Sequence, residues 1–316
     1  MKEFAKKIKF DKWKGWLYLS PAIVLLMIFT VWPIFNTIRM AFLENYDSLS
    51  AAGGTVFKFG IGNFKTVLEY KGFLTCLKNT VLLCFLTVPI STFLALLIAV
   101  CLNAIKPLQR FLQTIFFMPY VTNSIAIGMV FATMFNMIGI VPGQDPKSVG
   151  IINNIIEFFG GHYVNWMNAG SPYWANITVL VVYIVWNALP FKILILLGGL
   201  QSVNKQYYEA AKIDGTSRAR VFTRITVPLL SPMLAYVIIT GFIGGFKEYS
   251  SVVGIFGEKM RPPGALGYTL DTMVGYIYRR IGSQEGLASA GALILFGIIF
   301  IVTMINLYVS KKKTHY

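Results

Sequence analysis

Long apolar runs separated by shorter polar segments dominate this chain of 316 residues. Six runs approach the roughly 20 residues that an α-helix needs to cross the hydrocarbon core of a bilayer. They cover about 17–38, 80–102, 111–135, 176–200, 229–246 and 288–309. The pattern predicts an all-α integral membrane protein, with one membrane domain over 1–316, six transmembrane helices, and both termini on the same side.

The segments that connect these runs differ in their density of Lys and Arg. One set holds sixteen basic residues in short segments, and the other set holds eleven in loops that are several times longer in total. Basic residues concentrate on the cytoplasmic side of membrane proteins. We therefore expect the basic-rich set to be cytoplasmic, namely the N-terminal tail, 103–110, 201–228 and 310–316.

Composition supports a membrane protein, with 56% hydrophobic and 13% charged residues and a mean hydropathy of +0.64. The net charge of +15 does not indicate nucleic-acid binding, because no folded basic domain carries it. Cys76, Cys84 and Cys101 have no CxxC spacing, so we interpret them as small core residues.

Sequence signals for catalysis, metals or cofactors are absent. The chain contains no G-x-x-x-x-G-K-[ST] segment to hold nucleotide phosphates. The two histidines, His162 and His315, have no partner pattern for a metal or a catalytic triad. We expect a non-catalytic chain without a cofactor, so that any ATP-driven step requires another subunit.

A short polar insert interrupts the apolar pattern at 204–228. Asn204 can cap a first short helix that stops at Gly215, and Thr216 or Ser217 can cap a second helix that ends before Pro228. An ordinary solvated loop between two membrane helices is the alternative interpretation.

The order of residues in this insert resembles the EAA loop of binding-protein-dependent ABC importer permeases. It contains Glu209-Ala210-Ala211, then Gly215, then Ile225-Thr226-Val227-Pro228, with Val227 where the family usually has Leu. Four further segments resemble the carbohydrate branch of the maltose and glycerol-phosphate type: 116–136, "NWM" at 165–167, 185–202 and 286–295. That branch often carries T-x-G-G-P after the fifth helix, whereas this chain has "GIFGEKMRPPGALGYT" at 254–269.

This resemblance implies the type I ABC importer permease fold in a bacterial-type plasma (inner) membrane, crossed several times. The implied partners are a second homologous permease, two ATPase subunits, an extracytoplasmic solute-binding protein, membrane lipids and a carbohydrate substrate. In that family the first short helix of the loop docks into the ATPase and couples it to transport. The coupling residues would be Glu209, Ala210, Ala211, Asp214 and Gly215.

The resemblance also places a sugar path on the third, fourth and fifth spans. Counting from shared landmarks assigns to it Tyr120, Ser124, Asn187, Phe191, Gly245 and Glu248. Polar groups and an aromatic face suit sugar hydroxyls and the C–H surface of a sugar ring. The alternative interpretation is structural: Lys192 snorkels or pairs within the core, and Glu248 lies at the interface.

Two other functional classes remain as hypotheses. An ion-coupled secondary transporter of small polar solutes favours inverted repeats and acidic residues in mid-span, and the predicted spans contain essentially no Asp or Glu. An intramembrane enzyme needs a catalytic constellation, and none is visible. We therefore expect the permease subunit of an ATP-driven importer for a sugar or oligosaccharide.

Overall fold

The computed structural model describes residues 2–105, 109–138, 148–265 and 270–313. The chain divides into two compact units. One unit is Met1–Glu69 with Ile277–Ile294, and the other is Tyr70–Tyr276 with Leu295–Tyr316. Each unit is described separately, and the expected single membrane domain over 1–316 stays a prediction.

Candidate membrane-crossing helices lie at all six predicted apolar runs. Within the described ranges, four continuous helices are long and apolar enough to cross a bilayer: Lys14–Ala41, Lys71–Ala104, Tyr173–Ser202 and Glu285–Lys312. Two bent helix pairs, Phe111–Val121 with Ser124–Phe135 and Arg218–Leu229 with Ser231–Phe246, raise the number to six if each pair forms one span. The predicted number of spans is confirmed in that sense, but the third and fifth are not continuous.

The third span turns sharply between its two halves. The angle between Phe111–Val121 and Ser124–Phe135 is 100°. Pro119 lies in the 3₁₀ segment η2 (Met118–Val121) that ends the first half. Asn123 starts the second half, α7 (Ser124–Phe135), because its Oδ1 accepts from the backbone N–H groups of Ile125 and Ala126 at 2.9 and 3.2 Å. The predicted span over 111–135 therefore contains a sharp bend, since an end signal and a start signal lie side by side within the apolar run.

The fifth span is bent by 68°. Its first half consists of α11 (Arg218–Val221), the π-helical segment η3 (Phe222–Thr226) and α12 (Val227–Leu229). Pro228 lies at the first turn of α12, where a missing N–H is tolerated. The prediction that this helix ends before Pro228 is therefore wrong, because the bend comes after it, before α13 (Ser231–Phe246).

The first unit contains the first span and the segments that follow it. The helical elements here are α1 (Lys2–Leu26), η1 (Met27–Val31) and α2 (Trp32–Ala41). The most apolar window of the span Lys14–Ala41 has no buried residue. Buried Asn63 organises the connection, because its Nδ2 donates to the carbonyl oxygens of Ala41 and Leu43 at 3.1 and 2.7 Å. The unit also contains α3 (Ser48–Ala52), α4 (Gly62–Glu69) and the first residues of α16 (Glu285–Lys313).

Two capping contacts stabilise α3 in this unit. Asp47 Oδ1 accepts from the backbone N–H of Ser50 at 2.7 Å, and this hydrogen bond lowers the pKa of the Asp47 carboxyl. Ser48 Oγ donates to Glu285 Oε1 at 2.7 Å. These contacts join the loop after the first span to the start of α16.

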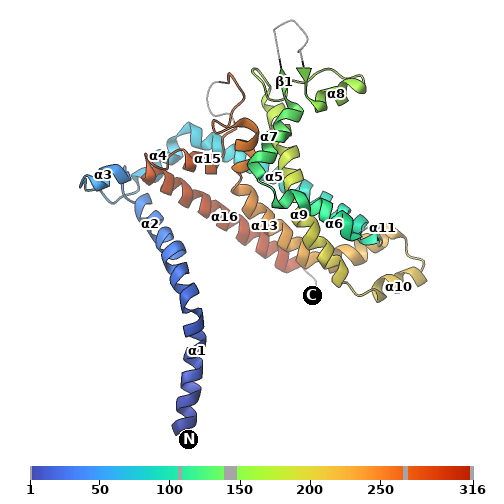
Figure 1. Cartoon of the computed structure of the whole chain (residues 1–316), viewed down its shortest axis with the longest axis horizontal. Helices are drawn as coiled ribbons and strands as arrows, with labels where there is room; N and C mark the ends of the chain where they lie inside the picture. Colours follow the sequence, from blue (N-terminus) through green and yellow to red (C-terminus); the bar gives the residue numbers. More distant parts are fainter. Residues whose placement is uncertain (1, 106–108, 139–147, 266–269, 314–316) are drawn as a thin grey trace. The chain divides into compact units, whose positions relative to one another are not determined.

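The second unit is built around two long helices that pack along each other, α5 (Lys71–Ala104) and α9 (Tyr173–Ser202) (Figure 1). Helix α13 packs against both of them. The core at one end of this group includes Leu83, Leu180, Tyr183, Val252 and Phe256, and the core at the other end includes Ala95, Ala99, Leu196, Leu200 and Val237.

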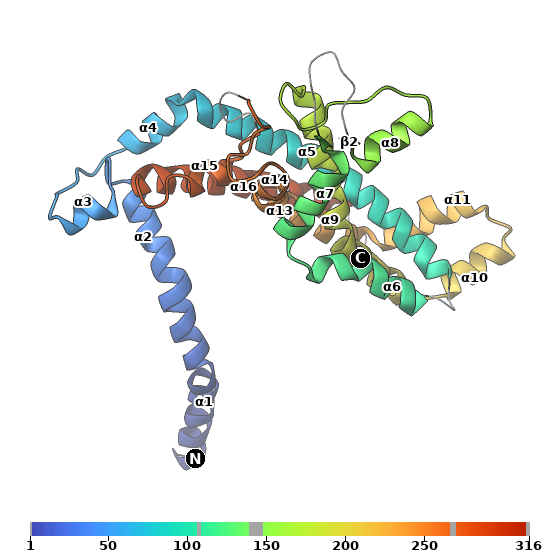
Figure 2. The same ribbon diagram turned by 45° about the horizontal axis from the view of Figure 1, so that its top comes forward.

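Shorter elements complete the second unit: α6 (Gln109–Phe117), β1 (Met137–Ile138), β2 (Ser148–Val149), α8 (Ile151–Phe158), α10 (Gln206–Ile213), α14 (Ser250–Phe256) and α15 (Met273–Tyr278) (Figure 2). The two strands pair antiparallel. Apart from this short pair, the described chain is helical, as predicted.

Two glycines allow α7 and α14 to cross at close range. A Cβ added at Gly128 would lie 2.9 Å from the Cα of Gly254, and one added at Gly254 would lie 3.0 Å from the carbonyl oxygen of Ile125. Any side chain at either position would force the helices apart. The segment 254–269, which differs from the family pattern, therefore begins at a helix crossing, while 266–269 lies outside the described residues.

The cysteines only partly match the expectation of small core residues. Cys76 and Cys84 are buried, but Cys101 is exposed. An apolar residue on a membrane helix can face lipid as readily as protein, so membership of an apolar run does not predict burial in the protein core.

Candidate functional site

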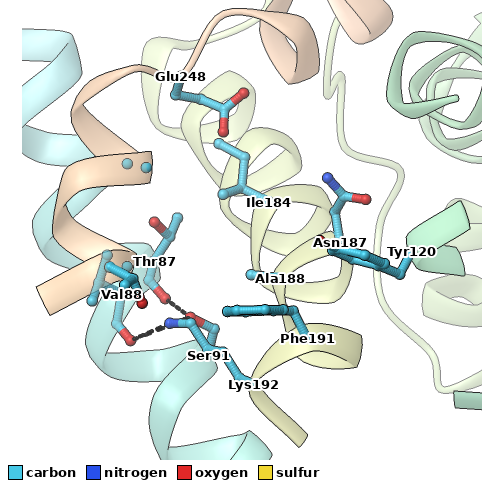
Figure 3. A pocket seen from close by; sticks show the side chains of 14 residues that line it. Thr87, Val88, Ser91, Tyr120, Ile184, Asn187, Ala188, Phe191, Lys192 and Glu248 are labelled. Carbon is cyan, nitrogen blue, oxygen red and sulfur yellow. Dashed lines mark hydrogen bonds between the residues drawn. The ribbon is translucent and has the colours of Figure 1, made fainter. Parts of the chain in front are cut away.

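A cavity of about 310 Å³ lies within the second unit, between α5, α9 and α13 (Figure 3). Its wall combines hydroxyl, amide, charged and aromatic side chains with three glycines. The lining residues are Thr87, Val88, Ser91, Tyr120, Ile184, Asn187, Ala188, Phe191, Lys192, Thr240, Gly241, Gly244, Gly245 and Glu248.

Five of the six residues predicted for a sugar path line this cavity: Tyr120, Asn187, Phe191, Gly245 and Glu248. The sixth, Ser124, is not a lining residue. Its backbone carbonyl accepts a hydrogen bond from the hydroxyl of Tyr183. Its Oγ accepts a hydrogen bond from Asn187 Nδ2 at 3.4 Å. Ser124 thus connects the start of α7 to α9 and orients Asn187.

Two aromatic rings form one wall of the cavity. The ring centroids of Tyr120 and Phe191 are 5.9 Å apart, with an interplanar angle of 19°. Tyr120 is 52% exposed, so its ring remains accessible. Figure 3 shows both rings beside Asn187. The wall offers a flat apolar surface next to an amide that can donate and accept.

Lys192 is a buried cation at this cavity. Its Nζ donates to Ser91 Oγ at 2.7 Å, to Thr92 Oγ1 at 3.0 Å and to the carbonyl oxygen of Val88 at 3.3 Å. These acceptors all belong to α5, and no carboxylate of the described residues forms an ion pair with Lys192. Lys192 therefore neither snorkels nor pairs with a charge. Instead, three acceptors on the neighbouring helix α5 satisfy the three N–H donors of its ammonium group.

Glycines on α13 allow this helix to approach α5 and α9. A Cβ at Gly241 would lie 3.1 Å from Val88 Cγ1 and 3.3 Å from Lys192 Nζ. A Cβ at Gly245 would lie only 2.8 Å from Cys84 Sγ. Gly245 lines the cavity, and its lack of a side chain is required by packing against α5.

Glu248 has a structural contact in addition to its place at the cavity. Its Oε1 accepts from the backbone N–H of Ser251 at 3.1 Å, in the first turn of α14. Because α14 crosses α7 at Gly254, the carboxylate that faces the cavity also fixes a helix outside it.

The second span also contributes to this cavity, with residues that the predicted sugar path did not include. Thr87 and Ser91 line the cavity from α5, on either side of Pro89. A usable signal was present, because polar residues four apart lie on one face of a helix. Among the described residues, no three His, Cys, Asp or Glu side chains come close enough together to hold a metal ion.

The polar insert forms the predicted short helix, α10. Lys205 holds the N-cap position, and Asn204, one residue before it, accepts at Oδ1 from the backbone N–H of Gln206 at 3.0 Å. Gly215 has a φ of +65° and ends the helix, where its N–H donates to Lys212 O and the Thr216 N–H donates to Ala211 O. These two bonds make a Schellman motif, which confirms the predicted stop at Gly215.

The predicted coupling residues divide into two groups. Glu209, Ala210, Asp214 and Gly215 are exposed and accessible to a partner, whereas Ala211 is only 5% exposed. The small Ala211 side chain therefore lies on the side of α10 that packs against other residues of this chain. Ser217 holds the N-cap position of α11, but its side chain makes no capping hydrogen bond, so that part of the prediction is wrong.

Comparison with known proteins identifies the family. Residues 81–315 match the model of the binding-protein-dependent transport system inner membrane component. The chain belongs to this family. This inner membrane component is 27% identical over 303 residues to the lactose transport system permease protein LacF of Rhizobium radiobacter, covering 95% of this chain and 94% of LacF. It is 31% identical over 300 residues to the arabinooligosaccharides transport system permease protein AraP of Halalkalibacterium halodurans, covering 93% of this chain and 87% of AraP.

A solved structure shares the fold of this inner membrane component. A chain of a bacterial ABC transporter that imports the acidic polysaccharide alginate aligns with a TM-score of 0.76. The identity is 22%, and the alignment covers 99% of this chain and 100% of that chain. The predicted fold, an all-helical ABC importer permease, is confirmed.

Proposed function

We propose that this inner membrane component is the non-catalytic permease subunit of an ATP-driven importer that carries a sugar or oligosaccharide. The observation that carries the proposal is the cavity wall. Stacked Tyr120 and Phe191 match the C–H face of a sugar ring, and Asn187 and Glu248 supply groups for hydroxyls. The names of the relatives, which refer to lactose and arabinooligosaccharides, support the same substrate class.

The proposed assembly contains a second homologous permease, two ATPase subunits and an extracytoplasmic solute-binding protein. The family description, a component of binding-protein-dependent transport, supports the last of these. A solved alginate transporter in complex with a periplasmic protein that holds an alginate pentasaccharide has the same fold, with a TM-score of 0.76. We place both termini and α10 on the cytoplasmic side of the inner membrane, on the basis of the Lys and Arg distribution.

In this proposal α10 transmits the motion of the ATPase to the membrane helices. It is a short helix with a firm C-terminal stop at Gly215, and the bent pair that follows leads directly into α13 at the cavity. Exposed Glu209 and Asp214 provide carboxylates for Arg or Lys of the ATPase. A displacement of α10 would then reach the cavity wall as a rigid-body movement.

The test is uptake by proteoliposomes that contain the complete complex. Lactose, maltose, trehalose and an arabinooligosaccharide are offered in turn with the cognate binding protein. We expect uptake of at least one sugar that requires ATP inside and continues when ionophores collapse all ion gradients. Uptake that needs no ATP and stops with ionophores would instead identify an ion-coupled secondary transporter.

A further inference from the structure

A second cavity, of about 550 Å³, lies between α10 and the membrane helices of the second unit. Its wall includes Val100 near the end of α5, Tyr208 and Lys212 on α10, Arg218 on α11, and Phe222 and Thr226 on η3. This cavity shares no lining residue with the candidate sugar cavity.

All the charged side chains that line this cavity are basic. Lys212 and Arg218 contribute to the wall, while the carboxylates of the same loop, Glu209 and Asp214, do not. Within the described residues, neither Lys212 nor Arg218 forms a salt bridge with a carboxylate. Two positive charges that share one cavity repel each other unless an anion lies between them.

Polar groups lie deeper in the same cavity. The Tyr208 hydroxyl lies 3.4 Å from Thr226 Oγ1, and Thr226 is 5% exposed. Thr226 Oγ1 also lies 3.4 Å from the carbonyl oxygen of Val221, five residues earlier, in the widened turn of the π-helical segment. Single π-helical turns inside α-helices are frequent at functional sites. These hydroxyls can donate to phosphate oxygens.

The position of the cavity points to the source of the anion. Val100 lies four residues before the end of α5, and Thr226 precedes α12 and α13. The ends of apolar membrane helices lie near the lipid headgroup layer, and Val100, Val221 and Phe222 give the cavity an apolar wall as well. A basic pocket between the cytoplasmic ends of membrane helices suits an anionic lipid headgroup.

We propose that this cavity binds the phosphate headgroup of an anionic phospholipid from the leaflet on the side of α10. Lys212 and Arg218 neutralise the phosphate, and the acyl chains extend along the apolar wall. The bound lipid holds α10 and α11 at a fixed spacing. This last effect rests on the proposed coupling function, whereas the binding site does not.

The test measures lipid retention by the purified full-length chain with native mass spectrometry. The chain is equilibrated with equal amounts of phosphatidylglycerol and phosphatidylcholine, each matched in acyl chains. We expect preferential retention of phosphatidylglycerol, and a loss of about tenfold or more in that preference for Lys212→Gln combined with Arg218→Gln. The matched control, Lys205→Gln with Arg220→Gln, removes two exposed basic residues outside the cavity and should leave the preference unchanged.

Further arms separate the alternatives. Lys212→Arg with Arg218→Lys keeps both charges and should retain the lipid, which excludes misfolding as the cause of the loss. Inorganic phosphate at tens of millimolar should not displace phosphatidylglycerol; full displacement would assign the cavity to a free anion and overturn the proposal. Equal retention of both lipids, or equal losses in the cavity and control variants, would also overturn it. None of these readouts requires transport, so they stand apart from the test of the proposed function.

Discussion

Lys192 Nζ on α9 donates to Ser91 Oγ on α5 at 2.7 Å, and this contact joins two long membrane helices beside the candidate sugar cavity. The acceptor is itself held in place. Ser91 Oγ donates to the carbonyl oxygen of Thr87 at 2.5 Å, so its lone pairs face the ammonium group. Thr92 repeats the arrangement by donating to the carbonyl oxygen of Val88 at 2.7 Å.

This arrangement predicts an asymmetry between the two partners. Ser91→Ala leaves a buried ammonium short of an acceptor, which costs about 1–3 kcal/mol. Lys192→Met removes the buried charge and leaves both hydroxyls bonded to their own helix, so its cost should be smaller. Thermal unfolding of the purified chain measures both, and Thr75→Ala, which removes an exposed hydroxyl of α5, is the control.

A double variant sharpens this prediction. Ser91→Ala with Lys192→Met should be more stable than Ser91→Ala alone, because the unsatisfied cation is gone. If the two single effects simply add, the hydrogen bond does not carry the stability of this contact.

The cavity predicts separable effects at Asn187 and Glu248. Asn187→Ala should weaken sugar uptake at low substrate concentration, because a hydroxyl partner worth about 1–3 kcal/mol is lost. Glu248→Gln keeps an oxygen for the Ser251 N–H and tests the charge, whereas Glu248→Ala also removes the contact that fixes α14. Uptake by the reconstituted complex, with co-purification of the partner subunits, measures these effects.

Thr178→Ala is the matched control for the cavity variants, since Thr178 is a half-buried residue of α9 outside the cavity, whose hydroxyl bonds to Trp174 O. Unchanged uptake in Asn187→Ala and Glu248→Gln at all sugar concentrations would reassign both residues to packing.

The left-handed backbone at Gly215 predicts uncoupling by larger residues. With φ at +65°, Gly215→Leu is strained and Gly215→Asp less so, whereas Gly215→Asn is tolerated best. No neighbouring atom lies within 4 Å of a Cβ added there, so the effect on this chain comes from the backbone, and bulk acts only against a partner. We expect an inserted protein with lost transport and lost or unregulated ATPase activity in the Leu and Asp variants, measured on the purified complex.

Normal transport in Gly215→Leu and Gly215→Asp would identify the insert as an ordinary connecting loop. Gly198→Leu is a control in a continuous helix, because a Cβ at Gly198 also meets no neighbour within 4 Å and no positive φ is involved.

The orientation predicts the labelling of single cysteines. A cysteine at Thr216 should react with a membrane-impermeant maleimide only when the cytoplasmic face is open. A cysteine at Val56, which is 94% exposed in the loop after the first span, should react in intact cells. Both are placed in a chain with Cys101→Ala, because Cys101 is exposed and would add background. Labelling of Thr216→Cys in intact cells would reverse the proposed topology.

Local signals in the chain were sufficient for the apolar spans and for the short helix of the polar insert. A run of about 20 apolar residues can satisfy its backbone in lipid only as a helix, so the number and approximate bounds of the spans follow from hydropathy. The stop at Gly215 is equally local, because Asn204, Gly215 and the short helix between them form one capped unit. Five of the six residues predicted by counting from Pro119, Pro190 and Pro228, on the strength of the family resemblance, line the cavity.

The inner arrangement of the helices required the three-dimensional structure. A membrane helix is apolar on all sides, so its sequence lacks the periodicity that reveals which face packs on protein. This is why the exposure of Cys101 and the entry of Thr87 and Ser91 into the cavity could not be predicted from the apolar pattern of α5. The partners of Lys192 lie about 100 residues away on α5. Only the rotation of α5 and α9 about their axes, which is set by packing and not by hydropathy, brings these groups within hydrogen-bond distance.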